Sequence, residues 1–185
     1  MDKFTRKAKK LGYRASSVFK LLNLNKKYNL IRKGSKVLDL GAAPGSWSQA
    51  CLDLKASFIL AIDLTPIENL NTNKVKTLIL DINDNNILTK IPQKFDVVLS
   101  DIAPKTTGII ELDQRRSLDL CNRVLYIAEN VLNKNGNFLC KIFQSEELVE
   151  FLDKLKKRFR FVKCTKPEAS KKASKEIYVI AKGFI

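Results

Sequence analysis

The chain has 185 residues, which suits one domain and leaves little room for a second. An apolar content of 45% is ordinary for a globular protein, and no stretch approaches the roughly 18 uninterrupted apolar residues of a membrane span, so we expect no membrane partner. The formal net charge of +15 favours a polyanionic partner.

The positive charge is concentrated in two arms. Residues 1–36 hold 12 Lys and Arg against one acid, and residues 154–175 hold 10 against one. The segment between them, 37–153, holds 11 against 16. This segregation predicts a nucleic-acid partner, with an anionic membrane surface as the weaker alternative and plain solvated charge as the simplest one.

Cysteine and histidine usage argues against a metal site. The four cysteines are far apart in the sequence, and histidine is absent. Zinc sites need clustered thiolates or imidazoles, so we expect no metal and read the cysteines as reduced, mostly buried residues of an intracellular protein. The cytoplasm is the expected compartment, with the nucleolus or an organelle such as the mitochondrion open if a targeting segment has been trimmed. The cysteines are Cys51, Cys121, Cys140 and Cys164.

Predicted helices and strands alternate along the chain. Helices are expected over 14–29 (with Ser16 or Ser17 as a cap), from Ser46, near 84–90, over 113–133 and over 146–159. Strands are expected over 36–40, 57–62, 75–80, 95–100 and 137–143, and around 160–165 and 176–181.

This alternation predicts an α/β fold with one Rossmann-like domain over residues 1–185, in which residues 1–36 form a basic helical arm. We expect a mostly parallel seven-stranded sheet with helices on both faces. The last two strands, joined by a basic loop at 166–175, predict an antiparallel hairpin at the sheet edge. The protein is expected to be a monomer.

Four predicted strands end in residues that can bind a ligand: Gly41, Asp63, Asp81 and Asp101. Ligands of open α/β sheets bind beyond the carboxyl ends of the strands. One such residue could be a loop glycine or a solvated acid, but the recurrence at four strand ends predicts a shared binding site.

The loop Gly41-Ala-Ala-Pro-Gly45 indicates which ligand this is. Pro44 lacks a backbone N–H, so the loop is a weak cradle for pyrophosphate, which disfavours an NAD-dependent oxidoreductase. S-adenosylmethionine carries no phosphate, and its positive charge suits the acidic centre of the chain. Gly41 and Gly45 allow close backbone approach, and Asp63 suits ribose hydroxyls.

The loop lies within Val37-Leu-Asp-Leu-Gly-Ala-Ala-Pro-Gly-Ser-Trp-Ser-Gln49, which resembles the cofactor loop of the FtsJ/RrmJ family of RNA 2′-O-ribose methyltransferases. The resemblance continues over nearly the whole chain, in Gly12-Tyr-Arg-Ala-Ser-Ser-Val-Phe-Lys20, Leu99-Ser-Asp-Ile-Ala-Pro104, Cys140-Lys-Ile-Phe-Gln144 and Lys166-Pro-Glu-Ala-Ser-Lys-Lys-Ala-Ser-Lys-Glu-Ile-Tyr178.

The resemblance implies a class I methyltransferase fold that uses S-adenosylmethionine. The family's catalytic tetrad would fall on Lys20, Asp101, Lys141 and Glu176, and its cofactor contacts on Gly45, Trp47, Asp63, Asp81 and Asp101. Ser46 stands where many members have a second glycine. Lys171 and Lys172 stand where the family often carries arginine, which would weaken bidentate phosphate contacts.

The resemblance also indicates a substrate. Leu112-Asp-Gln-Arg-Arg116 and Ser174-Lys-Glu-Ile-Tyr178 are more similar to the branch that acts on large-subunit ribosomal RNA. The branch acting on the tRNA anticodon loop is the alternative. A non-catalytic RNA-binding factor of ribosome assembly with the same fold is a candidate of another class. A methyltransferase for protein or small molecules is disfavoured by the basic arms.

Lys141 is the candidate general base that would take the proton from the ribose 2′-hydroxyl. Lysine acts as a base only when its pKa falls; Lys20 would push in that direction, and Asp101 and Glu176 would push against it. The sequence therefore leaves two roles open for Lys141: general base, or electrostatic steering of the attacking oxygen.

Overall fold

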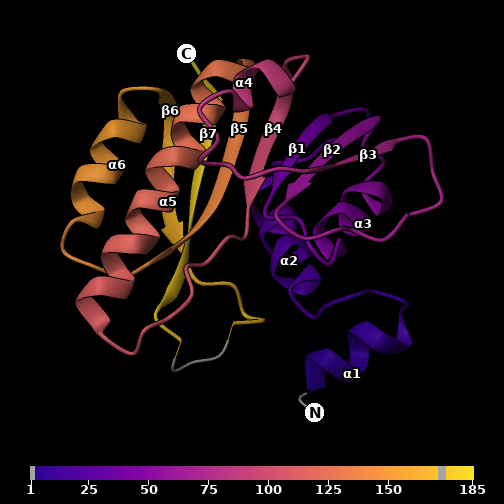
Figure 1. Cartoon of the computed structure of the whole chain (residues 1–185), viewed down its shortest axis with the longest axis horizontal. Coiled ribbons are helices and arrows are strands. Elements are labelled where there is room, and N and C mark those ends of the chain that lie inside the picture. Colours follow the sequence, from indigo (N-terminus) through magenta and orange to yellow (C-terminus); the bar gives the residue numbers. More distant parts are fainter. Residues whose placement is uncertain (1–2, 171–173) are drawn as a thin grey trace.

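The computed structural model describes residues 3–170 and 174–185 (Figure 1). Its helices are α1 (Lys3–Lys10), α2 (Val18–Tyr28), α3 (Ser46–Asp53), α4 (Ile87–Lys90), α5 (Ile110–Val131) and α6 (Leu148–Lys156). Its strands are β1 (Lys36–Leu40), β2 (Phe58–Asp63), β3 (Val75–Ile79), β4 (Phe95–Ser100), β5 (Leu132–Phe143), β6 (Phe159–Thr165) and β7 (Glu176–Phe184). The order is the predicted one, and α1 is a helix of the basic arm.

The strands form one seven-stranded sheet in the order β3-β2-β1-β4-β5-β7-β6. Strands β1 to β5 pair in parallel, whereas β7 is antiparallel to both β5 and β6. The predicted antiparallel pairing of the last two strands is confirmed, with β6 at the edge and β7 beside β5. Because β1 lies between β2 and β4, the strand order reverses there, which is the point where such sheets bind ligands.

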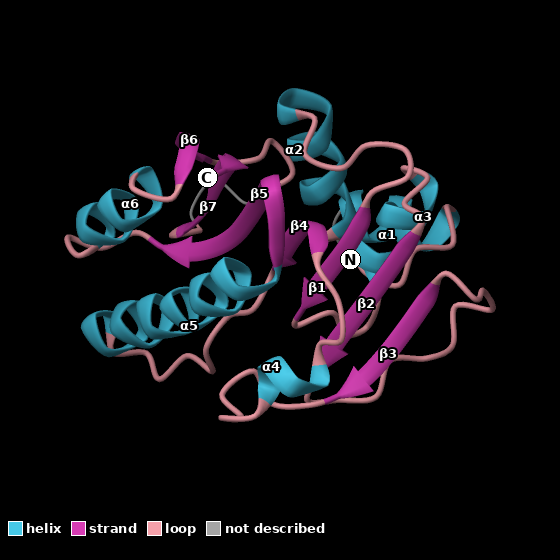
Figure 2. Ribbon diagram, turned by 90° about the horizontal axis from the view of Figure 1, so that it is seen from above, coloured by secondary structure: helices cyan, strands magenta, loops and turns pink. Residues whose placement is uncertain are grey.

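Helices cover both faces of the sheet (Figure 2). Side chains alternate between the faces of a strand, so Leu38 packs into the core under α5 and Val37 into the core under α2 and α3. Burying a large aliphatic side chain contributes about 1.5–3 kcal/mol, so these two cores hold the strand ends in place. Three of the four free cysteines are buried and Cys164 is half-buried. No helix among the described residues is long and apolar enough to cross a membrane.

The structure corrects the start of three predicted helices. The helix predicted from residue 14 begins only at Val18, since Arg14 and Ser17 contact α3 and residues 15–17 form turns in which each carbonyl accepts from the N–H three residues later. Ser17 occupies the cap position, but its hydroxyl lies 2.9 Å from that of Ser46 and makes no capping hydrogen bond. The helix predicted over 113–133 begins earlier, at Ile110, and the one predicted from 146 begins at Leu148.

Candidate active site

The residues that follow the first four strands meet at the carboxyl edge of the sheet. Gly41, Asp63, Asp81 and Asp101 all line one cavity of about 300 Å³. Parallel strands place their carboxyl ends side by side, which brings together residues that are far apart in the sequence. The structure therefore contains the predicted convergence of these four residues.

The lining of this cavity is both acidic and apolar. It combines three carboxylates with several aliphatic residues, and the described residues place no Lys or Arg in it. Walls of this kind suit a ligand with an apolar ring, hydroxyl groups and a positive charge. The aliphatic residues are Leu64, Leu80, Ile82, Ile102 and Leu120.

Hydrogen bonds orient two of the acids. The Asp63 carboxylate accepts from the Ala43 N–H at 2.9 Å and from the N–H and hydroxyl of Thr65 at 2.8 and 2.9 Å. Asp81 accepts from the Asn83 N–H at 2.8 Å. Both carboxylates keep unused lone pairs, because each oxygen can accept more than one hydrogen bond.

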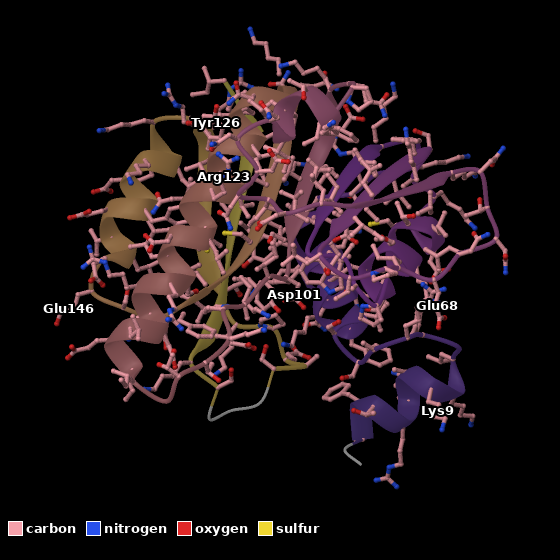
Figure 3. All side chains as sticks on the ribbon, in the orientation of Figure 1. Lys9, Glu68, Asp101, Arg123, Tyr126 and Glu146 are labelled. Atoms are coloured by element: carbon pink, nitrogen blue, oxygen red, sulfur yellow. The ribbon has the colours of Figure 1, made fainter. Side chains whose placement is uncertain are left out.

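Arg123 of α5 forms hydrogen bonds with the segment after Asp81, which makes up one wall of the cavity. Its guanidinium donates to the carbonyl oxygens of Ile82 and Asp84 at 2.6 and 2.7 Å and lies 5.1 Å from the ring centroid of Tyr126 (Figure 3). Arg123 thereby holds the segment after Asp81 in one conformation.

The glycines of the loop after β1 lie against the protein itself. Both Gly41 and Gly45 have positive φ, at 73° and 105°. A Cβ at Gly41 would overlap the Ile102 side chain, and one at Gly45 would lie 2.8 Å from Nη1 of Arg14. The positive φ and these close contacts with the chain itself therefore favour glycine at both positions. Gly45 is buried and does not line the cavity.

Arg14 fastens the basic N-terminal arm to this loop. Its Nη1 donates to the carbonyl oxygens of Pro44 at 2.9 Å and Glu68 at 2.8 Å, while its backbone N–H donates to Gln49. The motif that begins at Gly12 thus connects α1 and α2 to the loop after β1, a role that sequence reasoning did not assign.

The four predicted tetrad residues form one cluster of ion pairs. Nζ of Lys141 lies 3.2 Å from Oδ1 of Asp101 and 3.6 Å from Oε1 of Glu176. Nζ of Lys20 lies 3.3 Å from Oε2 of Glu176. Lys20 lies in α2, Asp101 follows the last residue of β4, Lys141 lies in β5 and Glu176 is the first residue of β7. Asp101 belongs both to this cluster and to the cavity, and Figure 3 shows it near the centre of the molecule.

The cluster controls the ionisation of Glu176. Burial alone would raise the pKa of Glu176, but the ammonium groups of Lys141 and Lys20 outweigh it and hold that pKa below its usual value. Glu176 therefore stays ionised at neutral pH and can orient both lysines.

Sequence reasoning missed Tyr178, which completes the cluster. Its hydroxyl donates to Asp101 at 2.6 Å, and Lys20 lies 5.8 Å from its ring centroid. Burial, and next the charge of Asp101, raise the pKa of Tyr178, so it remains a donor. Its ring packs against Trp47, which is buried, donates to the Ser17 carbonyl and does not line the cavity. Because Tyr178 is two residues after Glu176 in a strand, the alternation of side chains could have indicated it.

Asp39 was also missed. It is buried in β1, accepts from the Ser48 hydroxyl at 2.8 Å, and within the described residues its other oxygen has no hydrogen-bond partner. Burial raises the pKa of Asp39 to about 7, and the carboxylates of Asp101 and Asp63 add to this. An acid inside an apolar strand was the signal in the sequence.

The reversal of strand order, the acidic cavity beside it and the adjoining lysine–carboxylate cluster define a Rossmann-like α/β protein with a ligand site at the carboxyl edge of its sheet. A family model described as FtsJ-like methyltransferase matches residues 13–184. The chain belongs to this family of methyltransferases, as the sequence resemblance predicted.

Curated relatives are similar over nearly the full chain. The protein named ribosomal RNA large subunit methyltransferase E of Methanothermobacter thermautotrophicus is 43% identical, with 99% of this chain and 90% of that protein covered. The protein of the same name from Archaeoglobus fulgidus is 44% identical, with 99% and 96% covered.

Solved structures share the fold. A crystal structure described as a ribosomal RNA methyltransferase from Plasmodium falciparum has a TM-score of 0.81 at 28% identity, covering 93% of this chain and 98% of that one. A Streptococcus mutans protein described as a methyltransferase, in complex with SAH, has a TM-score of 0.60 at 13% identity, covering 88% and 95%. This second likeness concerns the fold alone.

Proposed function

We propose that the protein transfers a methyl group from S-adenosylmethionine to a ribose 2′-hydroxyl of large-subunit ribosomal RNA, acting as a monomer inside the cell. The observation that carries the proposal is the shared position of Asp101, which lines the acidic cavity and pairs with Lys141 at 3.2 Å. A methyl donor in the cavity and an acceptor at the cluster would therefore be neighbours. The names of the relatives support the choice of RNA.

The residues of the cavity fit S-adenosylmethionine. The carboxylates of Asp63 and Asp81 can accept hydrogen bonds from ribose hydroxyls or the amine, and the aliphatic walls can flank the adenine. An acidic lining without Lys or Arg among the described residues suits a cation. When bound, this cofactor supplies an activated methyl group. Gly45 and Trp47 lie outside this lining, and their contact with the cofactor stays a prediction.

Lys141 is assigned to the attacking oxygen. It is nine-tenths buried, and its ammonium is held between Asp101 and Glu176, so its Nζ has a defined position. A fixed group at this point can align a 2′-hydroxyl for in-line attack, which lowers the barrier by reducing the entropy lost on reaction. The geometry is compatible both with proton removal and with electrostatic steering of the oxygen. Lys20 and Tyr178 position Glu176 and Asp101.

Methylation of isolated substrates tests the proposal. The protein is incubated with radiolabelled S-adenosylmethionine and, in separate reactions, large ribosomal subunits, free ribosomal RNA and tRNA, and the methylated ribose is mapped. We expect label in large-subunit RNA. Label confined to the tRNA anticodon loop would assign the alternative branch. Binding of RNA and cofactor without transfer to any RNA would indicate the non-catalytic assembly factor.

A further inference from the structure

A second cavity lies at the opposite, amino end of the sheet. Its volume is about 570 Å³, and it is lined by the segment before β1, the starts of β4 and β5, and residues of β6 and β7. Asn137 of β5 pairs with Lys182 of β7 at this end, while Lys141 pairs with Tyr178 four positions further along. At about 3.3 Å per residue, the cavity is on the order of 13–20 Å from the tetrad. Figure 1 shows the C-terminus at this end and α1 at the other.

The lining of this amino-end cavity is strongly basic. It holds five cationic side chains and a single carboxylate, Asp96. Both oxygens of Asp96 are engaged, one by the Lys36 N–H and the other by the side-chain amide of Asn133, each at 2.9 Å. The five cations are Arg32, Lys33, Lys134, Arg160 and Lys182.

None of these five cations forms an ion pair with any residue in the described parts of the chain. Two are oriented by neutral acceptors: Lys182 donates to the Tyr28 carbonyl at 2.7 Å, and Arg160 donates to the Asn135 side chain. A concave surface of one sign focuses its field and attracts counter-charge. The cavity therefore has the volume and charge of an anion site. Its arginine guanidinium groups can donate paired N–H hydrogen bonds to a phosphate.

Exposed basic and aromatic side chains lie along β6 between the cavity and the tetrad. The edge strand β6 exposes Arg160, Phe161 and Lys163 and ends at Thr165, which pairs with Tyr178 of β7. Phe161 is 43% exposed, its ring centroid lies 6.4 Å from that of Tyr28, and side-chain alternation places it on the same face of β6 as Lys163. Cations interleaved with an exposed aromatic ring are typical of surfaces that track a nucleic-acid backbone and stack its bases.

We propose that the amino-end cavity binds a backbone phosphate of the RNA substrate at a point remote from the methylated ribose, with the RNA running along β6. This inference rests on the proposed RNA methyltransferase function and extends it. The contact requires an RNA that reaches on the order of 13–20 Å beyond the tetrad. Folded ribosomal RNA or an assembled subunit meets this requirement better than a short segment around the target ribose.

Two triple variants that remove the same charge test the proposal. Arg32→Ala/Lys33→Ala/Arg160→Ala removes three of the four exposed cations that line the cavity and leaves Lys134 in place. Lys74→Ala/Lys76→Ala/Lys90→Ala, the control, removes three exposed cations near β3 and α4. Binding of ribosomal RNA is measured as a function of NaCl concentration, and S-adenosylmethionine affinity is measured by calorimetry.

We expect the cavity variant to lower the slope of log affinity against log salt by about 0.7–0.9 for each phosphate that it no longer neutralises, and to weaken RNA binding about tenfold at physiological salt. The control should stay within about twofold of wild type, since it changes only the overall field of the protein. On an oligoribonucleotide that is too short to span the distance from the tetrad to the cavity, the cavity variant should behave as wild type.

Three results would overturn the proposal. Equal losses of affinity in both triple variants would mean that only the overall charge matters. An equal loss on the short RNA would place the phosphate at the target and not at the remote cavity. Inorganic phosphate that binds the wild type, fails to bind the cavity variant and is not displaced by RNA would assign the cavity to a small anion. If the wild type methylates no RNA, the proposed function fails, but these binding measurements still decide the role of the cavity.

Discussion

The two ends of the sheet differ in whether their charged side chains form ion pairs within the protein. At the carboxyl end, Lys20, Lys141, Asp101 and Glu176 alternate in sign and lie within 3.6 Å of a partner. At the amino end, five cations surround a cavity and none pairs with a carboxylate within the described residues. Charges that pair inside the protein define a fixed geometry, which suits chemistry. Cations without an ion-pair partner in the described residues can bind an anion from another molecule, which suits binding.

Breaking the paired cluster at Lys141 should have the largest effect. Lys141→Ala should lower the methylation rate by about 10²–10⁴-fold, because the group at the reacting oxygen is removed. Removing one partner of a buried ion pair also costs about 3–5 kcal/mol of stability, so the folding of the variant is checked by thermal unfolding. Single-turnover methylation with saturating cofactor and RNA measures the change in rate, with the exposed Lys76→Ala as control.

Lys141→Arg distinguishes the two roles. Guanidinium keeps the charge but does not give up a proton at working pH, so a general base predicts a reduction nearly as large as that of the alanine variant. An arginine variant with most of the activity would assign electrostatic steering. Full activity in both variants would contradict the tetrad assignment.

The second largest effect is expected from the acids of the cavity at the carboxyl end. Asp63→Ala and Asp81→Ala should each weaken S-adenosylmethionine binding by about ten- to a hundredfold, as expected for removal of one charged hydrogen bond of roughly 1.5–3 kcal/mol. Calorimetric titration measures this, while RNA affinity should be unchanged. Asp84→Ala is the matched control, because Asp84 also accepts a backbone N–H two residues later but does not line the cavity. Wild-type affinity in both cavity variants would refute the assignment.

Asp39 is an exception at the carboxyl end, since it is a buried acid without a cation. Its pKa is about 7 in the folded protein against 3.8 for an unperturbed carboxyl, so between these values the folded state holds a proton that the unfolded state has released. Stability should therefore fall as pH rises from about 4 to 7, by roughly 2 kcal/mol between pH 5 and 7.

Asp39→Asn should remove this dependence, because an amide does not titrate. Denaturant unfolding at pH 5, 6 and 7 measures it, with the exposed Asp153→Asn as control. A pH slope equal to that of the wild type would show that Asp39 is ionised in the folded protein throughout this range.

The smallest effect is expected on the basic N-terminal arm. Lys9→Ala/Lys10→Ala should reduce the salt slope of RNA binding by about 0.7–0.9 for each phosphate that these lysines neutralise, with cofactor affinity unchanged. Both side chains are exposed on α1, where Figure 3 shows Lys9 on the outer side. An unchanged slope would make them solvated surface charges. Lys171 and Lys172, predicted to contribute in the same way, lie outside the described residues.

The site at the carboxyl edge was predictable because it depends on local patterns. Asp63, Asp81 and Asp101 lie at or within two residues of the carboxyl ends of strands, and a parallel sheet places such positions at one edge whatever the details of packing. Asp101 and Lys141 lie together because β4 and β5 pair in parallel, with Ser100 beside Cys140. Tyr178 and Asp39 carried weaker signals, since a tyrosine or an acid within a strand has many structural explanations.

The order of the strands, the distances within the tetrad and the amino-end cavity were decided by tertiary structure. Whether Lys141 pairs with one carboxylate or two depends on β7 lying between β5 and β6, a position that no local pattern specifies. The cations of the cavity come from segments as far apart as Arg32 and Lys182, which only the assembled sheet brings together. Sequence periodicity encodes which face a residue takes, because side-chain direction is local. Which charges then meet is a property of long-range packing, and so is the difference between the two ends of this sheet.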